Sequence, residues 1–202
     1  MDQPLRLDLE RPNPIGSSPP RCSPENCSHQ KRDGPILMQQ AAPDELKMFS
    51  QARGARSLAE LPGYAYDARG GEGVTVYIMD TGINPNHPVS VRDYQYTIRL
   101  TPFQEFTNMR GSLRWLYIPG EPQIQSDENG HGTCVVSKVM GPTFGVAKSA
   151  NIVVVKVPPI NGRFRMSRVF HSWAVAALDI ASNNLQGRAV FTTTVDGEQS
   201  GS

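Results

Sequence analysis

The sequence has few cysteines, no long hydrophobic run and no dominant charge. Three cysteines in 202 residues are an odd number, which argues against a disulfide framework. The longest apolar runs are far shorter than the roughly 20 residues that a membrane-spanning helix needs. Lys and Arg (20) nearly balance Asp and Glu (19), for a net charge of +1. We therefore expect neither a membrane nor a nucleic acid as a partner.

The N-terminal segment, residues 1–43, lacks apolar periodicity and the basic and apolar regions of a secretory signal. It contains eight of the 17 prolines, which favours disorder. The compartment stays unassigned, because an intracellular location and a missing true start both fit. The group Cys22, Cys27 and His29 offers three potential zinc ligands without a closely spaced fourth, so we favour solvated thiols over a metal site.

Three short β-branched runs predict buried strands: Val74–Met79, Ile152–Val157 and a weaker one, Arg188–Val195. The first of them ends at Asp80. Before them, residues 44–70 are expected to form a lead-in segment with a short helix capped by Asp44. Residues 71–202 then form the domain that carries the strands.

Two helices are expected between these strands. One covers Cys134–Met140, and the other begins at a capping Ser167 and is stopped by Asn183-Asn184. The resulting βαβαβ order indicates a parallel sheet, and the fold class is α/β. The apolar stripe expected to cover the sheet from the second helix is Val169, Trp173, Ala177 and Ile180.

Asp80 and His131 are the candidate catalytic residues. Asp80 ends a buried strand, and in open parallel sheets ligands bind at the carboxyl ends of the strands. His131 lies between two glycines at the start of a helical pattern, where the backbone can approach a substrate closely. Taken singly, Asp80 could be a turn residue or helix cap, and His131 a solvent-facing histidine in a hairpin turn.

Together, Val76-Tyr77-Ile78-Met79-Asp80-Thr81-Gly82-Ile83 and His131-Gly132-Thr133 resemble the Asp and His motifs of subtilisin-like serine proteases of the peptidase S8 type. The resemblance continues through Gly145-Val146-Ala147-Lys148 and covers about residues 71–195. It implies a parallel-sheet subtilisin-like fold and a polypeptide substrate. In this family, His131 would be the general base, and Asp80 would fix its tautomer and stabilise the imidazolium.

The nucleophilic serine of that family is not found. In the subtilisin order the Ser follows the His by on the order of 150 residues, whereas this sequence ends 71 residues after His131. We therefore expect an incomplete fold and a truncation or an altered gene model. The serines that follow the histidine lack the flanks of a Gly-Thr-Ser-Met-Ala-like segment: Ser137, Ser149, Ser167, Ser172 and Ser182.

Further expectations follow from the resemblance. Thr192 and Thr194 fall where the family has a strand that pairs with the substrate backbone. The segment Val89–Pro122 is expected to be a surface insertion, Cys134 a buried helix thiol, and His87 and His171 surface or supporting residues. No cofactor is expected; calcium stabilises many relatives, but no calcium loop is identifiable.

Three interpretations of the whole chain stay open. The first is a serine endopeptidase of which this chain holds Asp80 and His131 but no serine, so that the chain alone is inactive. The second is a non-catalytic remnant that binds peptides or proteins through the strand near Thr192. The third is a product that does not fold stably, because half of a doubly wound sheet leaves an apolar edge uncovered.

Overall fold

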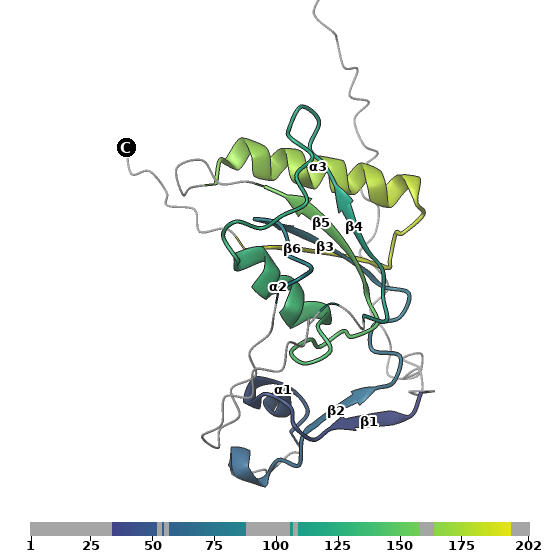
Figure 1. The fold of residues 1–202 in the computed structure, drawn as a ribbon. Helices are drawn as coiled ribbons and strands as arrows, with labels where there is room; N and C mark the ends of the chain where they lie inside the picture. Colours follow the sequence, from purple (N-terminus) through teal and green to yellow (C-terminus); the bar gives the residue numbers. More distant parts are fainter. Residues whose placement is uncertain are drawn as a thin grey trace, which may run out of the picture. The chain divides into compact units, whose positions relative to one another are not determined.

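A four-stranded parallel sheet forms the frame of the candidate site (Figure 1). The computed structural model describes residues 34–51, 54, 57–87, 106, 109–157 and 164–194. Within these residues the strand order is β4-β5-β3-β6. The elements are β3 (Thr75–Asp80), β4 (Leu113–Leu116), β5 (Asn151–Lys156), β6 (Ala189–Thr193), α2 (His131–Met140) and α3 (Met166–Ser182).

Strand β3 is buried on both faces because a helix covers each side of it (Figure 1). Successive side chains of a strand point to opposite faces. Val76 and Ile78 pack with residues of α2, whereas Tyr77 and Met79 pack with residues of α3. All six residues of β3 are buried, which explains the continuous apolar run in the sequence.

The predicted α/β class is confirmed, with the chain order β3-α2-β5-α3-β6. The predicted strands match β3, β5 and β6 to within two residues at each end. Helix α2 begins at His131, three residues before the predicted start. Consequently, the candidate histidine is the first residue of a helix and does not lie in the preceding loop.

Helix α3 differs from its prediction in its cap and in the face it buries. Arg165 is the residue before the helix and no side chain caps it, so Ser167 lies within the first turn. Trp173 is 42% exposed, because the stripe facing the sheet is rotated from the predicted one. The buried residues of α3 are Val169, Ser172 and Ala176. The predicted stop is confirmed, with Asn183 as the C-cap and Asn184 at a φ of 52°.

A polar cluster fastens α3 to the sheet. The Asp179 carboxylate accepts hydrogen bonds from the Tyr77 hydroxyl and the Arg114 guanidinium. Burial alone would raise the pKa of Asp179, but the hydrogen bonds from Arg114 and Tyr77 outweigh burial and lower it. For Tyr77, burial and the Asp179 carboxylate raise the pKa to about 12. The cluster joins β3, β4 and α3.

The predicted surface insertion at Val89–Pro122 is wrong for part of its length. Strand β4 belongs to the sheet and pairs in parallel with β5, with Trp115 opposite Val154. The residues 88–105 lie outside the described part of the chain. Charged and aromatic residues in β4 hid this strand, because an edge strand needs fewer apolar residues than a central one.

The lead-in segment forms a small layer of its own. Strand β1 pairs antiparallel with β2, and α1 packs Leu46 against Tyr64. Helix α1 starts at Asp44 itself, and Pro43 precedes it without a side-chain cap. The prediction that Asp44 caps this helix is therefore wrong. Strand β1 lies inside the 1–43 segment expected to be disordered. The bounds are β1 (Ile36–Gln39), α1 (Asp44–Phe49), the 3-10 helix η1 (Leu58–Glu60) and β2 (Tyr64–Asp67).

Candidate active site

Asp80 is the last residue of β3 and is completely buried. Its Oδ1 accepts a hydrogen bond of 2.7 Å from the backbone N–H of Thr81. Its Oδ2 is buried and has no hydrogen-bond partner among the described residues. Burying a carboxylate in this position is costly unless hydrogen-bond donors or a cation compensate for the lost water.

His131 provides the second contact of the Asp80 carboxylate. Its Nδ1 lies 2.7 Å from Asp80 Oδ1. The His131 side chain is 45% exposed, whereas that of Asp80 is 0% exposed. An ionised carboxylate only accepts hydrogen bonds, so the neutral imidazole that fits this contact carries its proton on Nδ1. This tautomer leaves the Nε2 lone pair available to take up a proton.

Two glycines allow the strand end and the helix start to approach each other. A Cβ at Gly132 would collide with the carbonyl oxygen of Gly82. A Cβ at Gly82 would collide with the carbonyl oxygen of Ser126, and Gly82 has a φ of +119°. Both positions thus require glycine. The Gly132 that follows the histidine in the sequence motif serves this close approach.

Asp127 organises the loop that precedes His131. Its Oδ1 accepts hydrogen bonds from the Thr81 hydroxyl (2.7 Å) and from the N–H groups of Asn129 (3.1 Å) and Gly130 (2.9 Å). Its Oδ2 accepts from the N–H (2.8 Å) and the hydroxyl of Thr133. Burial opposes ionisation of Asp127, but these donors outweigh it and lower the pKa to about 2. Asp127 also places negative charge at the N-terminus of α2.

Lys156 holds the same loop from the side of the sheet. Its Nζ donates to the Ser126 carbonyl oxygen at 2.8 Å and forms an ion pair of 2.7 Å with Glu128. The Lys156 side chain is 8% exposed and that of Glu128 is 68% exposed. The hydrogen bond from Lys156 lowers the pKa of Glu128. A buried ammonium that reaches a carbonyl and a carboxylate satisfies its charge locally.

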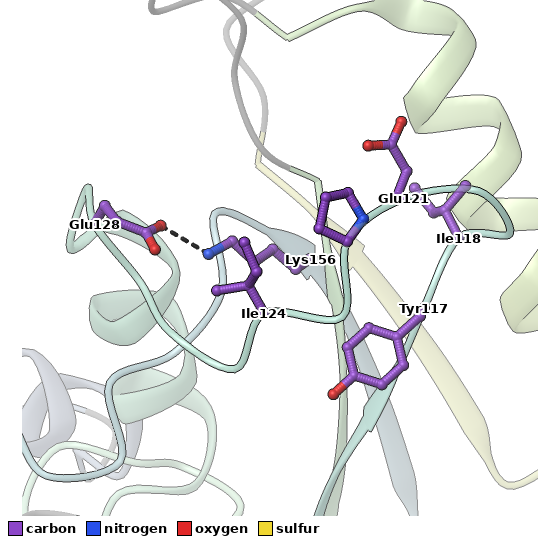
Figure 2. A pocket seen from close by; sticks show the side chains of 7 residues that line it. Tyr117, Ile118, Glu121, Ile124, Glu128 and Lys156 are labelled. Carbon is purple, nitrogen blue, oxygen red and sulfur yellow. Dashed lines mark hydrogen bonds and ion pairs between the residues drawn. The ribbon is translucent and has the colours of Figure 1, made fainter.

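A pocket of about 170 Å³ lies beside this ion pair (Figure 2). Figure 2 shows the dashed contact between Glu128 and Lys156 on one side and the Tyr117 ring on the other. The apolar walls of the pocket come from the segment between β4 and His131. The lining residues are Tyr117, Ile118, Glu121, Pro122, Ile124, Glu128 and Lys156.

The other residues singled out in the sequence lie away from the Asp80–His131 contact or at the surface. Thr192 lies in β6 opposite Ile78, and Thr194 is exposed just beyond the end of β6. Neither contacts the Asp80–His131 pair through a described hydrogen bond. Cys134 is exposed on α2, so the predicted buried thiol is wrong. His87 and His171 are surface residues, as predicted.

The structure bears on metal binding and on membrane spans only for the residues that it describes. Cys22, Cys27 and His29 lie outside the described residues. Among the residues that the structure does describe, no group of three His, Cys, Asp or Glu side chains could hold a metal ion. No helix in the same ranges has both the length and the apolar content to cross a bilayer.

Fold and geometry define an α/β protein whose candidate site lies at the carboxyl end of the parallel strand β3, the edge of such sheets where ligands bind. The sequence profile of the subtilase family, peptidase S8, matches residues 71–187, and the chain belongs to this family. Subtilisin-like protease 2 of Arthroderma benhamiae is 33% identical over 150 residues, which cover 74% of this chain and 31% of that protein.

A second relative gives the same result. Subtilisin-like protease 3 of Trichophyton tonsurans is 33% identical over 137 residues, 66% of this chain and 29% of that protein. The chain thus spans about 30% of the length of these curated relatives. The predicted resemblance to subtilisin-like serine proteases is confirmed at the level of the family.

Sequence reasoning missed Asp127 and Lys156 as parts of the site. Asp127 lies in a run of turn-forming residues before His131, and its signal was missed although an aspartate shortly before a helix start is typical of capping. Thr133 follows it at the third position of α2, and its N–H is one of the donors that a cap satisfies. Lys156 carried no signal, because a lysine at a strand end usually reaches solvent.

Proposed function

We propose that this chain supplies the aspartate and the histidine of the catalytic triad of a subtilisin-like serine endopeptidase that hydrolyses peptide bonds. The observation that supports this proposal is the 2.7 Å contact between His131 Nδ1 and Asp80 Oδ1 at the end of β3. The curated relatives are named proteases, and the polypeptide substrate is carried over from those names.

In this proposal Asp80 accepts the Nδ1–H of His131 and holds the ring in the tautomer that exposes Nε2. Nε2 then takes the proton of a serine hydroxyl as the hydroxyl attacks the scissile carbonyl carbon. The buried Asp80 carboxylate stabilises the imidazolium that forms. His131 afterwards gives the proton to the leaving amine, which breaks the peptide bond. The half-exposed ring is accessible to a substrate.

The remaining parts of the machinery are assigned to no residue of this chain. No serine after His131 has the flanks of the family's nucleophile, and no oxyanion donor is identified. Thr192 and Thr194 are proposed to lie along the substrate backbone, because β6 is the strand next to β3 and its end adjoins that of β3.

A chimera tests the proposed roles. Residues 71–187 of this chain replace the matched segment of subtilisin-like protease 2 of Arthroderma benhamiae, which keeps the rest of its own sequence. We expect the chimera to hydrolyse a fluorogenic peptide. Asp80→Asn is expected to lower kcat by about 10⁴-fold and His131→Ala by about 10⁶-fold, the losses that removal of these triad members causes.

The matched control is His87→Ala, because His87 is an exposed histidine outside the pair. Circular dichroism of each variant verifies that the chimera is folded. A folded, active chimera whose turnover survives His131→Ala would show that His131 is not the general base. Loss of turnover in His131→Ala but not in His87→Ala supports the proposal.

The outer edge of β6 favours a second candidate function, the binding of extended polypeptides. In the described part of the chain, β6 is an edge strand, with Val190 51% and Phe191 44% exposed. Arg188 O accepts from Thr75 N, so in the alternating pattern of a parallel ladder Phe191 presents its backbone groups to the outer edge. A peptide could pair there as an added strand.

Pull-down with a peptide library tests this second function. Phe191→Pro removes an outward N–H and is expected to weaken binding, whereas Phe191→Leu keeps the N–H and is expected to retain it. A folded sample that captures no peptide would remove this candidate function.

A further inference from the structure

We propose that Asp127 is a positioning residue that fixes His131 relative to Asp80. This inference rests on the proposed function, since it assigns a role within the same pair. Asp127 itself contacts neither His131 nor Asp80 in a described hydrogen bond. It acts through the residue after Asp80 and through residues on both sides of His131.

The Asp127 carboxylate joins the two segments that carry the pair. Oδ1 accepts from the hydroxyl of Thr81, the residue directly after Asp80, at 2.7 Å. Oδ2 accepts from the N–H of Thr133, two residues after His131, at 2.8 Å. One side chain thereby connects the end of β3 with the first turn of α2.

Thr81 adds a second connection through the same hydroxyl. Its Oγ1 donates to Asp127 and accepts from the N–H of Gly132 at 3.0 Å. Thr133 Oγ1 in turn accepts from the N–H of Asn84 at 3.0 Å, beyond the end of β3. The hydrogen bonds therefore run from the segment after Asp80 to residues on both sides of His131, and Asp127 takes part on both ends.

Side-chain acceptors from the preceding loop hold the start of α2, because the residue before the helix is a glycine. Gly130 adopts a φ of 89° and has no side chain that could cap α2. The N–H of His131 donates instead to Asn129 Oδ1 at 3.3 Å. The N–H groups of the first helical turn have no partner within the helix. Asp127 accepts from the N–H groups of Gly130 and Thr133 and so fixes the helix start.

Lys156 does not replace this function. It binds Ser126 and Glu128, which precede and follow Asp127, and it reaches them from β5. Lys156 thus fixes the loop backbone, whereas the link between α2 and the end of β3 is made by Asp127 together with the Thr81 hydroxyl. Catalytic groups must be held to within a fraction of an ångström, so a small shift of α2 would break the contact between Nδ1 and Asp80.

The tautomer of His131 in the full 202-residue chain tests this inference. Long-range ¹H–¹⁵N spectra of the histidine-labelled protein report which ring nitrogen carries the proton, and His131→Ala assigns the signals. In the wild type we expect the Nδ1–H form. Asp80→Asn provides the reference for a lost contact, because it changes the tautomer preference of such a pair.

Asp127→Asn is expected to move the His131 signals most of the way to those of Asp80→Asn. Asp179→Asn is the matched control, since it removes a hydrogen-bonded carboxylate from the other face of the sheet, and its His131 signals should equal those of the wild type. Unchanged His131 signals in a folded Asp127→Asn chain would overturn the inference.

If circular dichroism shows that Asp127→Asn does not fold, Thr81→Val decides, because it keeps the side-chain shape and removes both bonds of the hydroxyl. A folded Thr81→Val chain with wild-type His131 signals would also overturn the inference. Identical spectra of the wild type and Asp80→Asn would instead contradict the pair itself and with it the proposed function. The two failures are therefore distinguishable, and neither readout requires turnover.

Discussion

Asp80 and Lys156 end two adjacent parallel strands in the same register, yet their side chains serve different parts of the site. The Asp80 carboxylate faces His131 at 2.7 Å. The Lys156 ammonium reaches instead to the Ser126 carbonyl oxygen at 2.8 Å, in the loop that leads to His131. Asp80 at the end of β3 thus contacts the histidine directly, and Lys156 at the end of β5 fixes the loop that precedes it.

This arrangement predicts that the isolated 202-residue chain has no measurable peptidase activity. Asp80 and His131 can orient and move a proton, but the sequence contains no serine with the flanks of the family's nucleophile. Hydrolysis of a fluorogenic peptide should equal the buffer background. Turnover above background that disappears in His131→Ala would contradict this expectation.

Acid should destabilise the chain through Asp127. Its pKa is lowered from 3.8 to about 2 by its hydrogen-bond donors, against the effect of burial. A carboxyl group with a lowered folded-state pKa contributes stability above the unfolded value, and this contribution is lost as the pH falls through the folded value. The window is therefore between about pH 4 and pH 2.

Urea unfolding at a series of pH values measures the effect. After allowance for solvent screening of this half-buried group, we expect the free energy of unfolding to fall by about 1–2 kcal/mol across the window. Asp127→Asn should be less stable at pH 5 and should lack this component of the pH dependence. An equal decrease in the wild type and in Asp127→Asn would assign the acid effect to other carboxyl groups.

The central fold was predictable because its signals are local and strong. β3 and β5 are buried on both faces, so their sequences are continuous β-branched runs that need no knowledge of their neighbours. The end of α3 was also predictable, since Asn184 has the left-handed conformation that asparagine tolerates. Asp80 and His131 could be identified because each sits at an element boundary within a recognisable motif.

Features set by tertiary contacts were not predictable. Trp173 is spaced like an inward-facing residue, but Ser172 is buried in its place and donates to the Val169 carbonyl oxygen, so the face of α3 is rotated. The strand β4 depends on pairing with β5 and on Arg114 meeting Asp179, which are distant in sequence. Asp127 likewise gains its role only when Thr81 is brought beside it.

The last prediction concerns Gly82, whose missing side chain allows the loop before His131 to pack against the end of β3. Gly82 and Gly120 both have positive φ, +119° and +82°. An alanine at Gly120 meets no atom within 4 Å, so Gly120→Ala isolates the conformational cost, about 1–2 kcal/mol. An alanine at Gly82 adds a collision with the Ser126 carbonyl oxygen.

We therefore expect Gly82→Ala to lower the free energy of unfolding by about 2 kcal/mol more than Gly120→Ala, as measured by urea denaturation. Because Ser126 adjoins Asp127, the forced shift of the loop should also move the His131 NMR signals in Gly82→Ala but not in Gly120→Ala. Equal destabilisation by the two substitutions would mean that the loop at Ser126 moves away from the new Cβ without lowering the free energy of unfolding. The close contact at Gly82 would then contribute nothing to holding His131 beside Asp80.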